Sequence, residues 1–566
     1  MEYLVFGVLA IAFVTAIITM DVINDRKKQK QFEQSLRRDY GTLKKKEISP
    51  ERFIRIDKYF QKHQEKGQID DVTWFDLGMD EIYKVINVTN SASGEEYLYY
   101  TLRSAGKDEA FLAKFEKIVE YFRTHEDERV NVQILASKLG YMGKYSIYDY
   151  VDNLDYLGER SNKRHWICNA LLLACIGIIP FQASIGIMLC VAVMLYNILS
   201  YFKEKDEIEP YVISFIYVLK LLKAGEELGK FPGKEEEFFA EDLKQLQRLK
   251  ASLSKLQKGS FWVVSGHGSL GGNPTYLLMD YLKMTFHVDL IRFNQMLKFL
   301  RQNVKEVDEL NTILGKYETA IAIGAWRTGL ERTNGYCVPN LWEGNAKGFC
   351  MEEGYHPLLA EPVKNSLSAD RGILLTGSNA SGKSTFLKTV AINAILAQTI
   401  HTCTAKSYCA PFYRIYSSMS LRDDVEGGDS YYVVEIKALK RILNAAGEAG
   451  RPVICFVDEV LRGTNTVERI AASTQVLKSL VRDDVFCLAA THDVELTELL
   501  KKDYDNYHFE EEVVDGDVRF QYKLLEGKAT TRNAIRLLEI IGYDEKIVRK
   551  AQDMAQRFLD DGRWSL

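Results

Sequence analysis

Residues 372–385 comprise a short apolar run, a glycine-containing loop and the start of a helix, in the pattern G-x-x-x-x-G-K-S. Gly377 and Gly382 let the backbone curl so that successive N–H groups point inward at one anion. Lys383 is spaced to reach the same anion, and the Ser384 hydroxyl is spaced to ligate Mg²⁺. The pattern predicts a strand–loop–helix unit that binds nucleotide phosphates. Its candidate residues are Gly377, Ser378, Asn379, Ala380, Ser381, Gly382, Lys383, Ser384 and Thr385.

A second apolar run, residues 453–459, ends in two carboxylates, Asp458 and Glu459. The strand beside a phosphate loop has to deliver an acidic ligand to Mg²⁺, and Asp458 has the position for this. Glu459 lies one residue further on, where a carboxylate can accept a proton from the attacking water as a general base. The two runs together predict a site for ATP and Mg²⁺ with Lys383 and Glu459 as catalytic residues.

Two more polar residues lie where other segments end. His492 follows the apolar run 486–490, and at a sheet edge it can sense the γ-phosphate or orient water, although a histidine at such a position is often only structural. Ser430 follows Gly427 and Gly428 and precedes a predicted helix, so its hydroxyl and the free amides form an anion-binding end. The sequence alone does not say which phosphate Ser430 meets.

The composition narrows the class of protein. The 566 residues are 46% hydrophobic and 27% charged, which predicts several globular domains. The net charge of −5 offers no global basic field, so any contact with nucleic acid needs a local patch. The nine cysteines form no C-x-x-C, which argues against a zinc site and a disulfide framework and fits a reducing compartment.

Two stretches carry no charge, Tyr3–Met20 and Trp166–Phe202. The first is followed by the basic run 26–30 and predicts an uncleaved transmembrane anchor with its C-terminal side in the cytoplasm. The second is too long for one crossing and holds a potential turn at residues 180–184, so it predicts a helical hairpin with both ends cytoplasmic. A re-entrant hairpin and a buried hairpin of a soluble core remain alternatives. The basic stretch 25–50 is either a solvated helix or a site of attraction to anionic membrane lipid.

These segments divide the chain into five parts: residues 1–24 as the anchor, 25–165 as a cytoplasmic helical region, 166–202 as the transmembrane hairpin, 203–345 as a second helical region, and 346–566 as an α/β domain. In the last part, short β-rich runs alternate with helices, which is typical of a mainly parallel sheet. The expected localisation is the cell membrane, multi-pass, with the α/β domain in the cytoplasm.

Six motifs resemble the MutS family of ATPases, the family of DNA mismatch repair. They are Gly377–Thr385, Ser430–Glu435, Asp458–Thr466, Ala490–Leu496, Gly354–Leu358 and Tyr522–Gly527. More weakly, Trp74–Leu77 with Ser93–Leu98 resembles the start of the family's helical core, and Glu306–Ala320 resembles the segment that enters the ATPase domain.

The resemblance implies a P-loop NTPase domain of the ABC/MutS-like kind, preceded by an all-α core and lever region that here holds three predicted transmembrane helices. It also implies a head-to-tail homodimer with nucleotide at the interface, in which Ser430 reaches the partner's γ-phosphate. His356 and Tyr522 become candidates for packing near the adenine, and residues 544–558 become a helical dimerisation element.

The differences from the family leave open which molecule or structure this ATPase acts on. No mismatch-reading domain precedes the core, and Phe239-Ala240-Glu241, which has the letters of the family's mismatch wedge, lies in a charged helical run. The first expectation is a membrane-anchored ATPase coupled to a DNA structure. The alternative is an ATP-gated membrane or protein-assembly switch with no DNA function, and a transporter-like ATPase is a third.

Overall fold

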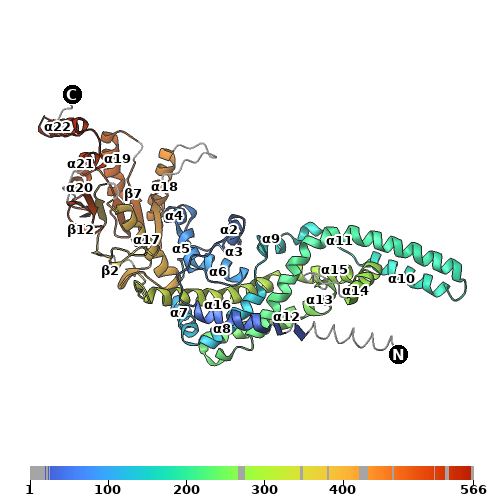
Figure 1. The fold of residues 1–566 in the computed structure, drawn as a ribbon. Coiled ribbons are helices and arrows are strands. Elements are labelled where there is room, and N and C mark those ends of the chain that lie inside the picture. The colour runs from blue at the N-terminus through green and yellow to red at the C-terminus, as the bar shows by residue number, and fades with distance from the viewer. Residues whose placement is uncertain are drawn as a thin grey trace.

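The computed structural model describes residues 19–20, 23–24, 26–264, 274–344, 348–378, 381–419, 431–461, 464–514, 517–528 and 534–561. The molecule is elongated, with an α/β domain at one end, a helical hairpin at the other and a helical core between them (Figure 1). The predicted anchor Tyr3–Met20 lies almost entirely outside the described residues. The first strand begins at Asn340, six residues before the expected domain boundary at residue 346.

The helical part holds short 3-10 turns at Leu154–Leu157 and Pro232–Glu235 and the following α-helices: α2 Pro50–Ile56, α3 Lys58–Lys62, α4 Asp71–Asp76, α5 Met79–Ile86, α6 Ala92–Arg103, α7 Glu109–Thr124, α8 Glu126–Leu139, α9 Tyr148–Val151, α10 Lys163–Ile178, α11 Ala183–Leu228, α12 Glu237–Gln257, α13 Ser260–Val264, α14 Pro274–Phe286, α15 Val288–Gln302 and α16 Val304–Glu331. Helix α16 is the centre of this part and packs against α6, α7, α8, α11 and α12.

The contact between α6 and α16 depends on glycine. A Cβ on Gly315 would lie 2.5 Å from Cβ of Tyr97 and 2.6 Å from the carbonyl oxygen of Ser93. The two backbones therefore approach more closely than any larger residue allows. Nearby, Phe239 is fully buried against Tyr121 and Tyr317, which makes it a core residue rather than an exposed wedge.

The predicted hairpin is present as α10 and α11, which lie side by side (Figure 1). Helix α11 continues through the expected boundary at 202/203 and through Pro210 to Leu228, for 46 residues or about 69 Å. Its second half packs in the core against α8, α12 and α16, so hairpin and core share one continuous helix. The charged residues from Lys203 onward mark a change in the environment of the helix, but the helix continues through them.

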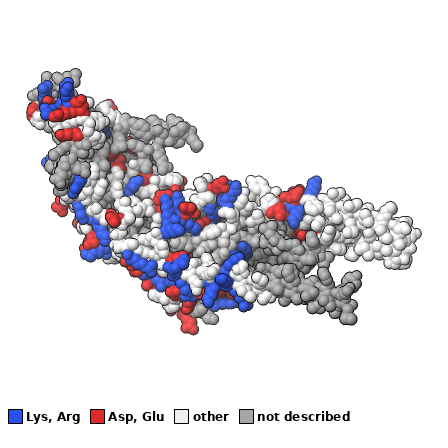
Figure 2. Space-filling view, in the orientation of Figure 1, with Lys and Arg blue, Asp and Glu red and all other residues white. Residues whose placement is uncertain are grey.

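Among the described helices, one, α11, is long and apolar enough to cross a membrane. The shorter arm α10 has 16 residues. Exposed apolar side chains cover both arms, and Figure 2 shows almost no charged residue on the visible face of this end. The three predicted transmembrane spans stay a prediction.

The α/β domain contains a six-stranded sheet in the order β12-β9-β4-β8-β7-β6, in which only β12 is antiparallel. A four-stranded sheet, β1-β5-β2-β3, and the hairpin β10-β11 accompany it. The strands are β1 Asn340–Trp342, β2 Phe349–Gly354, β3 Asn365–Ala369, β4 Ile373–Thr376, β5 Ser407–Pro411, β6 Arg414–Ser418, β7 Val453–Asp458, β8 Val485–Ala490, β9 Asp505–His508, β10 Glu511–Val514, β11 Asp517–Phe520 and β12 Leu525–Glu526. The helices are α17 Lys383–Ile400, α18 Tyr431–Ala446, α19 Thr466–Ser479, α20 Glu495–Leu499, α21 Ala534–Ile541 and α22 Glu545–Asp561.

The alternating side chains of β7 show which helices cover each face of the six-stranded sheet. Ile454 and Phe456 belong to the same apolar cluster as α17, whereas Val453, Cys455 and Val457 belong to the cluster that contains residues of α18 and α19. Because successive side chains of a strand point to opposite faces, α17 covers one face and α18 with α19 covers the other. The six-stranded sheet is mainly parallel, as predicted, whereas the four-stranded sheet mixes parallel and antiparallel pairs.

A buried arginine joins the helical core to the α/β domain. Arg327 of α16 has no exposed surface, pairs with Glu116 of α7 and donates to the carbonyl oxygen of His401 at 2.8 Å and to the Thr402 hydroxyl at 2.8 Å. Burial alone would raise the pKa of Glu116, but hydrogen bonds from Arg327 and His401 outweigh it and lower this pKa to about 2.

We expect Glu116→Gln to destabilise the protein at pH 7 by about 3 kcal/mol, because it leaves the buried guanidinium without its charged partner. Since the pKa of Glu116 is depressed in the folded state, its contribution is present above the ordinary value of about 4.5 and is lost as pH falls toward 2. The difference in free energy of unfolding between wild type and variant should therefore shrink across that interval in denaturant titrations. Glu120→Gln, one helical turn away and half-exposed, is the matched control; a constant difference at all pH values would contradict the assignment.

Candidate functional site

The phosphate loop lies between β4 and α17, as the sequence predicts. Gly377 has φ 144° and Gly382 has φ 106°, both in the region that favours glycine. A Cβ on Gly377 would lie 2.5 Å from the carbonyl oxygen of Phe509, so the loop also requires a glycine there for space. The ammonium group of Lys383 is buried and donates to the carbonyl oxygens of Gly377 and Ser378, both at 2.8 Å.

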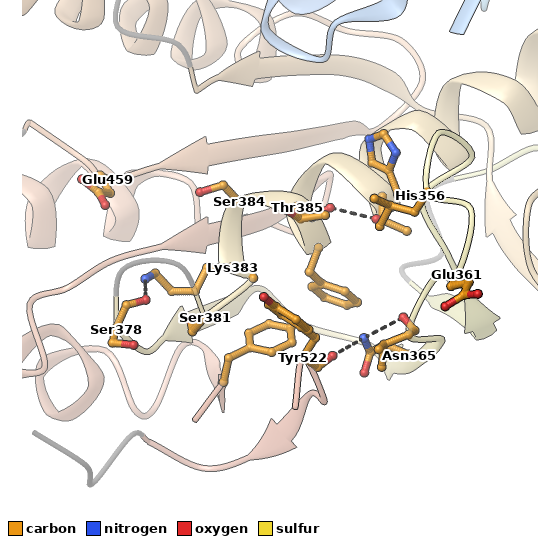
Figure 3. A pocket seen from close by; sticks show the side chains of 17 residues that line it. His356, Glu361, Asn365, Ser378, Ser381, Lys383, Ser384, Thr385, Glu459 and Tyr522 are labelled. Atoms are coloured by element: carbon orange, nitrogen blue, oxygen red, sulfur yellow. Dashed lines mark hydrogen bonds between the residues drawn. The ribbon is translucent and has the colours of Figure 1, made fainter. Parts of the chain in front are cut away.

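A cavity of about 500 Å³ opens beside this loop. Figure 3 shows Glu459, Ser378 and Lys383 at one end of it and His356, Glu361 and Asn365 at the other. The lining also includes Ser381, Gly382, Ser384, Thr385, Phe386, Thr389, Phe509 and Tyr522. The volume lies in the range of small-molecule sites. One end therefore presents an ammonium group and hydroxyl groups, which suit phosphates. The other end presents a histidine ring and an amide, which suit a nucleobase.

The acidic strand ends beside the loop. Asp458 is the last residue of β7, and among the described residues its buried Oδ1 has no hydrogen-bond partner. An orphaned carboxylate oxygen at this edge fits a ligand of Mg²⁺, with the Ser384 hydroxyl as the second protein ligand. Within the described part of the chain, no cluster of three or more His, Cys, Asp or Glu side chains is arranged to hold a metal, so the phosphates and water would have to complete the coordination.

Glu459 and His492 come together at the ends of neighbouring strands. The Glu459 carboxylate forms an ion pair with Nε2 of His492, and the Glu459 amide donates to the carbonyl oxygen of Ala490 at 2.9 Å. Glu459 has φ 58°, a left-handed conformation that a non-glycine residue rarely adopts. The backbone is therefore held in an uncommon conformation at the residue predicted to act as base, as is frequent at functional sites.

Both candidates for packing near the adenine, His356 and Tyr522, line the cavity. His356 follows β2 and lines the cavity, and burial together with nearby Lys388 lowers its pKa to about 4, so the ring is neutral at physiological pH. Its Nδ1 accepts from the Leu358 amide at 3.3 Å. Tyr522 lines the same cavity, and its ring lies 3.1 Å from the position of a Cβ on Gly382. Asn379, Ala380 and Ser430 lie outside the described residues.

Sequence reasoning missed the residues that hold this pocket in shape. The Asn365 amide donates to the carbonyl oxygen of Tyr522 at 2.9 Å, and its Oδ1 accepts from the Leu524 amide at 2.9 Å. The Ser378 hydroxyl donates to Glu511 at 2.7 Å. These partners are more than 130 residues apart, and only a fold-level alignment of strands could have suggested them.

An arginine of α19 braces the turn that carries His492. Arg469 of α19 forms a two-point ion pair with Asp493, at 2.8 and 2.7 Å. Asp493 directly follows His492, and its amide donates to the Thr491 hydroxyl at 3.0 Å. Arg469 therefore fixes the turn that carries the histidine.

The comparison with protein families gives the identity of this domain. Residues 373–559 match the model of MutS domain V, a segment that contains β4, the phosphate loop, the acidic strand and His492. The α/β domain of this chain is therefore similar to MutS domain V. The chain is 32% identical to the DNA mismatch repair protein MutS of Aquifex pyrophilus over 263 residues, 44% of this chain and 30% of that one. It is 34% identical to the DNA mismatch repair protein MutS 2 of Haloarcula marismortui over 186 residues, 32% of this chain and 19% of that one.

A third relative, the MutS protein of Thermus aquaticus, is 32% identical over 211 residues, 36% of this chain and 26% of that one. The chain thus spans less than a third of the length of each of these curated relatives. The hairpin α10–α11 and the helical core lie outside the region that the domain V model matches. The similarity to MutS domain V therefore accounts for the α/β domain, and the hairpin needs its own explanation.

Proposed function

We propose that the protein binds and hydrolyses Mg·ATP in the 500 Å³ cavity. One observation carries this proposal: the phosphate loop, the acidic strand end and the Glu459–His492 pair meet at one sheet edge. At that strand end, Oδ1 of Asp458 has no hydrogen-bond partner among the residues that the structure describes. Each element supplies a different requirement of phosphoryl transfer, namely charge neutralisation, a metal ligand and a base for water.

The chemistry is positioning combined with electrostatic stabilisation. Lys383 is already held at the loop and neutralises phosphate charge. Ser384 and Asp458 would hold Mg²⁺, which neutralises developing negative charge when bound. Glu459 accepts the proton of the attacking water, and His492 orients the Glu459 carboxylate and stabilises its charge. His356 and Tyr522 contact the adenine at the other end of the cavity.

The proposal includes a homodimer with two composite sites, because Ser430 is expected to serve the nucleotide of a second copy. The amphipathic helix α22 has the exposed apolar residue Ile547 in its first turn, and the exposed Tyr543 precedes it, which supports a role for the C-terminal end in dimerisation. In a head-to-tail pair, each loop then meets the Ser430 segment of the partner.

The structure on which ATP hydrolysis acts is proposed to lie at a membrane. Leu173 and Leu195 of the hairpin are 61% and 57% exposed, in a surface of exposed apolar side chains that runs over both arms. The surface ends at a pair of charges, Arg164 and Glu204, 3.2 Å apart. From Glu204 to the tip at Ala183, α11 measures about 32 Å, close to the thickness of the hydrocarbon core of a bilayer.

A hydrophobic photoreactive probe dissolved in liposomes tests the membrane proposal on the full chain. We expect label on peptides from residues 166–202, because their side chains face lipid, and none on the peptide containing Val467. Val467 is the matched control, since it is 80% exposed and apolar but belongs to the α/β domain. Equal labelling of the two peptides, or absence of label on the hairpin, would contradict membrane insertion.

Two processes are proposed as outputs, that is, as what ATP hydrolysis drives. The relatives are named DNA mismatch repair proteins, which supports coupling of ATP hydrolysis to a DNA structure. The continuity of hairpin and core through α11 favours the second candidate, an ATP-gated membrane or protein-assembly switch. Binding of the full chain to mismatched and branched duplexes over a range of salt concentrations separates them. Salt-dependent affinity supports the first output; its absence, with intact ATP hydrolysis, supports the second.

A further inference from the structure

Helix α4 lies against the end of the edge strand β6, although the two are more than 330 residues apart in the chain. Oδ2 of Asp76 accepts two hydrogen bonds there, from the Ser417 hydroxyl at 2.7 Å and from the Met419 amide at 2.9 Å. The Ser417 amide donates to the Thr73 hydroxyl at 3.2 Å. Asp76 is only 5% exposed, and Thr73 and Ser417 are fully buried, so these are interior contacts.

A second set of contacts brings in helix α18. The Arg441 guanidinium pairs with Asp70 at 2.5 Å and donates to the carbonyl oxygen of Ser417 at 2.6 Å. Asp70 is also the N-cap of α4, where its side chain accepts from the Thr73 amide at 2.8 Å. We call these five residues the latch: Asp70, Thr73, Asp76, Ser417 and Arg441. The latch binds the helical core to a strand and a helix of the α/β domain at once.

The latch lies beside the acidic end of the ATP site. Strand β6 pairs with β7 up to Ser418 and Val457, and Asp458 follows directly. Asp76, Met419 and Asp458 line one small cavity of about 30 Å³, together with Val72, Glu435 and Ala438. Glu435 of α18 also accepts from the Leu461 amide, in the loop just after Glu459.

The latch also holds both neighbours of the segment that carries Ser430. Residues 420–430 lie outside the described part of the chain, but Met419 precedes them and α18 begins at Tyr431. Asp76 fixes the Met419 amide, and Arg441 fixes α18 to Ser417. Contacts of the latch thus reach the metal and γ-phosphate side of the site and leave Lys383 and the adenine end untouched.

We propose that Asp76, supported by Thr73 and the Asp70–Arg441 pair, is a positioning residue for ATP hydrolysis. It couples the helical core to the alignment of the acidic strand end and of the chain flanking Ser430. The inference rests on the proposed ATPase function. It predicts a specific split: loss of the latch lowers kcat and leaves nucleotide affinity unchanged, because the contacts that bind the nucleotide lie elsewhere in the cavity.

The test compares three variants in the full chain. We expect Asp76→Ala to lower kcat at least tenfold, with the dissociation constant for a non-hydrolysable ATP analogue within twofold of wild type. Asp76→Asn should keep more than half of kcat, because its side-chain oxygen can accept both hydrogen bonds. Asp71→Ala is the matched control, since Asp71 is on the same helix but faces Arg103. Wild-type kcat in Asp76→Ala would overturn the proposal, as would a parallel loss of affinity and thermal stability.

Hydrogen exchange distinguishes failure of the latch from failure of the ATPase function. In wild type, the analogue should slow amide exchange at residues 71–77 and at Met419, and Asp76→Ala should abolish this protection. If wild type hydrolyses no ATP but shows this nucleotide-dependent protection, the hydrolysis proposal fails and the coupling stands. If wild type binds the analogue and exchange in α4 does not respond, the latch proposal is wrong.

Discussion

Glu459→Gln is expected to reduce ATP hydrolysis by about a hundred- to ten-thousand-fold, the usual contribution of a general base. Glutamine keeps the size of the side chain and can still hydrogen-bond to His492, but it cannot take a proton from water at neutral pH. The contacts to the phosphates are unaltered, so the variant should bind ATP as tightly as wild type. The expected species is an ATP-loaded, closed dimer that accumulates because the chemical step is blocked.

The measurement is the rate of phosphate release, combined with the amount of unhydrolysed ATP that stays with the protein after gel filtration. Glu448→Gln is a suitable control, because Glu448 lies in the same domain and is exposed beside Arg414. Unchanged turnover in Glu459→Gln would refute its assignment as base. Loss of ATP binding would instead indicate that the carboxylate holds the pocket together.

Lys383→Ala is expected to weaken nucleotide binding by roughly 150-fold, which corresponds to about 3 kcal/mol for the loss of charged hydrogen bonds to phosphate. Its ammonium group is buried at the loop, held by the carbonyl oxygens of Gly377 and Ser378, so it is positioned before the ligand arrives. No other described lysine or arginine lines the cavity, so nothing in its lining replaces the lost charge.

Equilibrium titration with a fluorescent ATP analogue checks this prediction. Lys406→Ala is the matched control, because Lys406 is an exposed lysine of the same domain, paired with Glu352. Adenosine should bind both variants equally, since it has no phosphates. Equal affinity of Lys383→Ala and wild type for the ATP analogue would place the nucleotide outside this cavity.

The phosphate loop, the acidic strand and the strand before His492 could be predicted because their information is local. Each is a short apolar run followed at once by the polar residue it presents, and the parallel sheet then brings the three ends to one edge. Glu459 and His492 meet for that reason. The hairpin was equally predictable, because a long charge-free stretch with a central turn allows few other folds.

Residues that act across the fold could not be predicted in the same way. Asn365 holds Tyr522, and Asp76 holds Met419, through hydrogen bonds between segments that only the tertiary structure brings together. Nothing in the neighbouring sequence of Asp76 distinguishes it from a solvated helix-end carboxylate. The continuation of α11 past Lys203 was missed because a change of polarity marks a change of environment, which a helix can cross without ending.

The placement of α11 suggests how ATP hydrolysis and the hairpin are connected. The helix packs on α16, and α16 carries Arg327, which is bonded to the chain just after α17. Helix α17 begins at the phosphate loop itself. A short series of packed helices therefore runs from the loop to the hairpin, and the latch forms a second link on the other side of the site.

The central claim is that this cavity is half of a composite ATP site, completed by Ser430 of a second copy. The most direct test mixes two variants, Lys383→Ala and Ser430→Ala, each expected to be inactive alone. In a mixed head-to-tail dimer, one site carries both defects and the other carries none. Mixing equal amounts should restore about a quarter of wild-type turnover, since half of the dimers are mixed and one of their two sites is intact. No recovery, while cross-linking shows that mixed dimers form, would contradict a composite site.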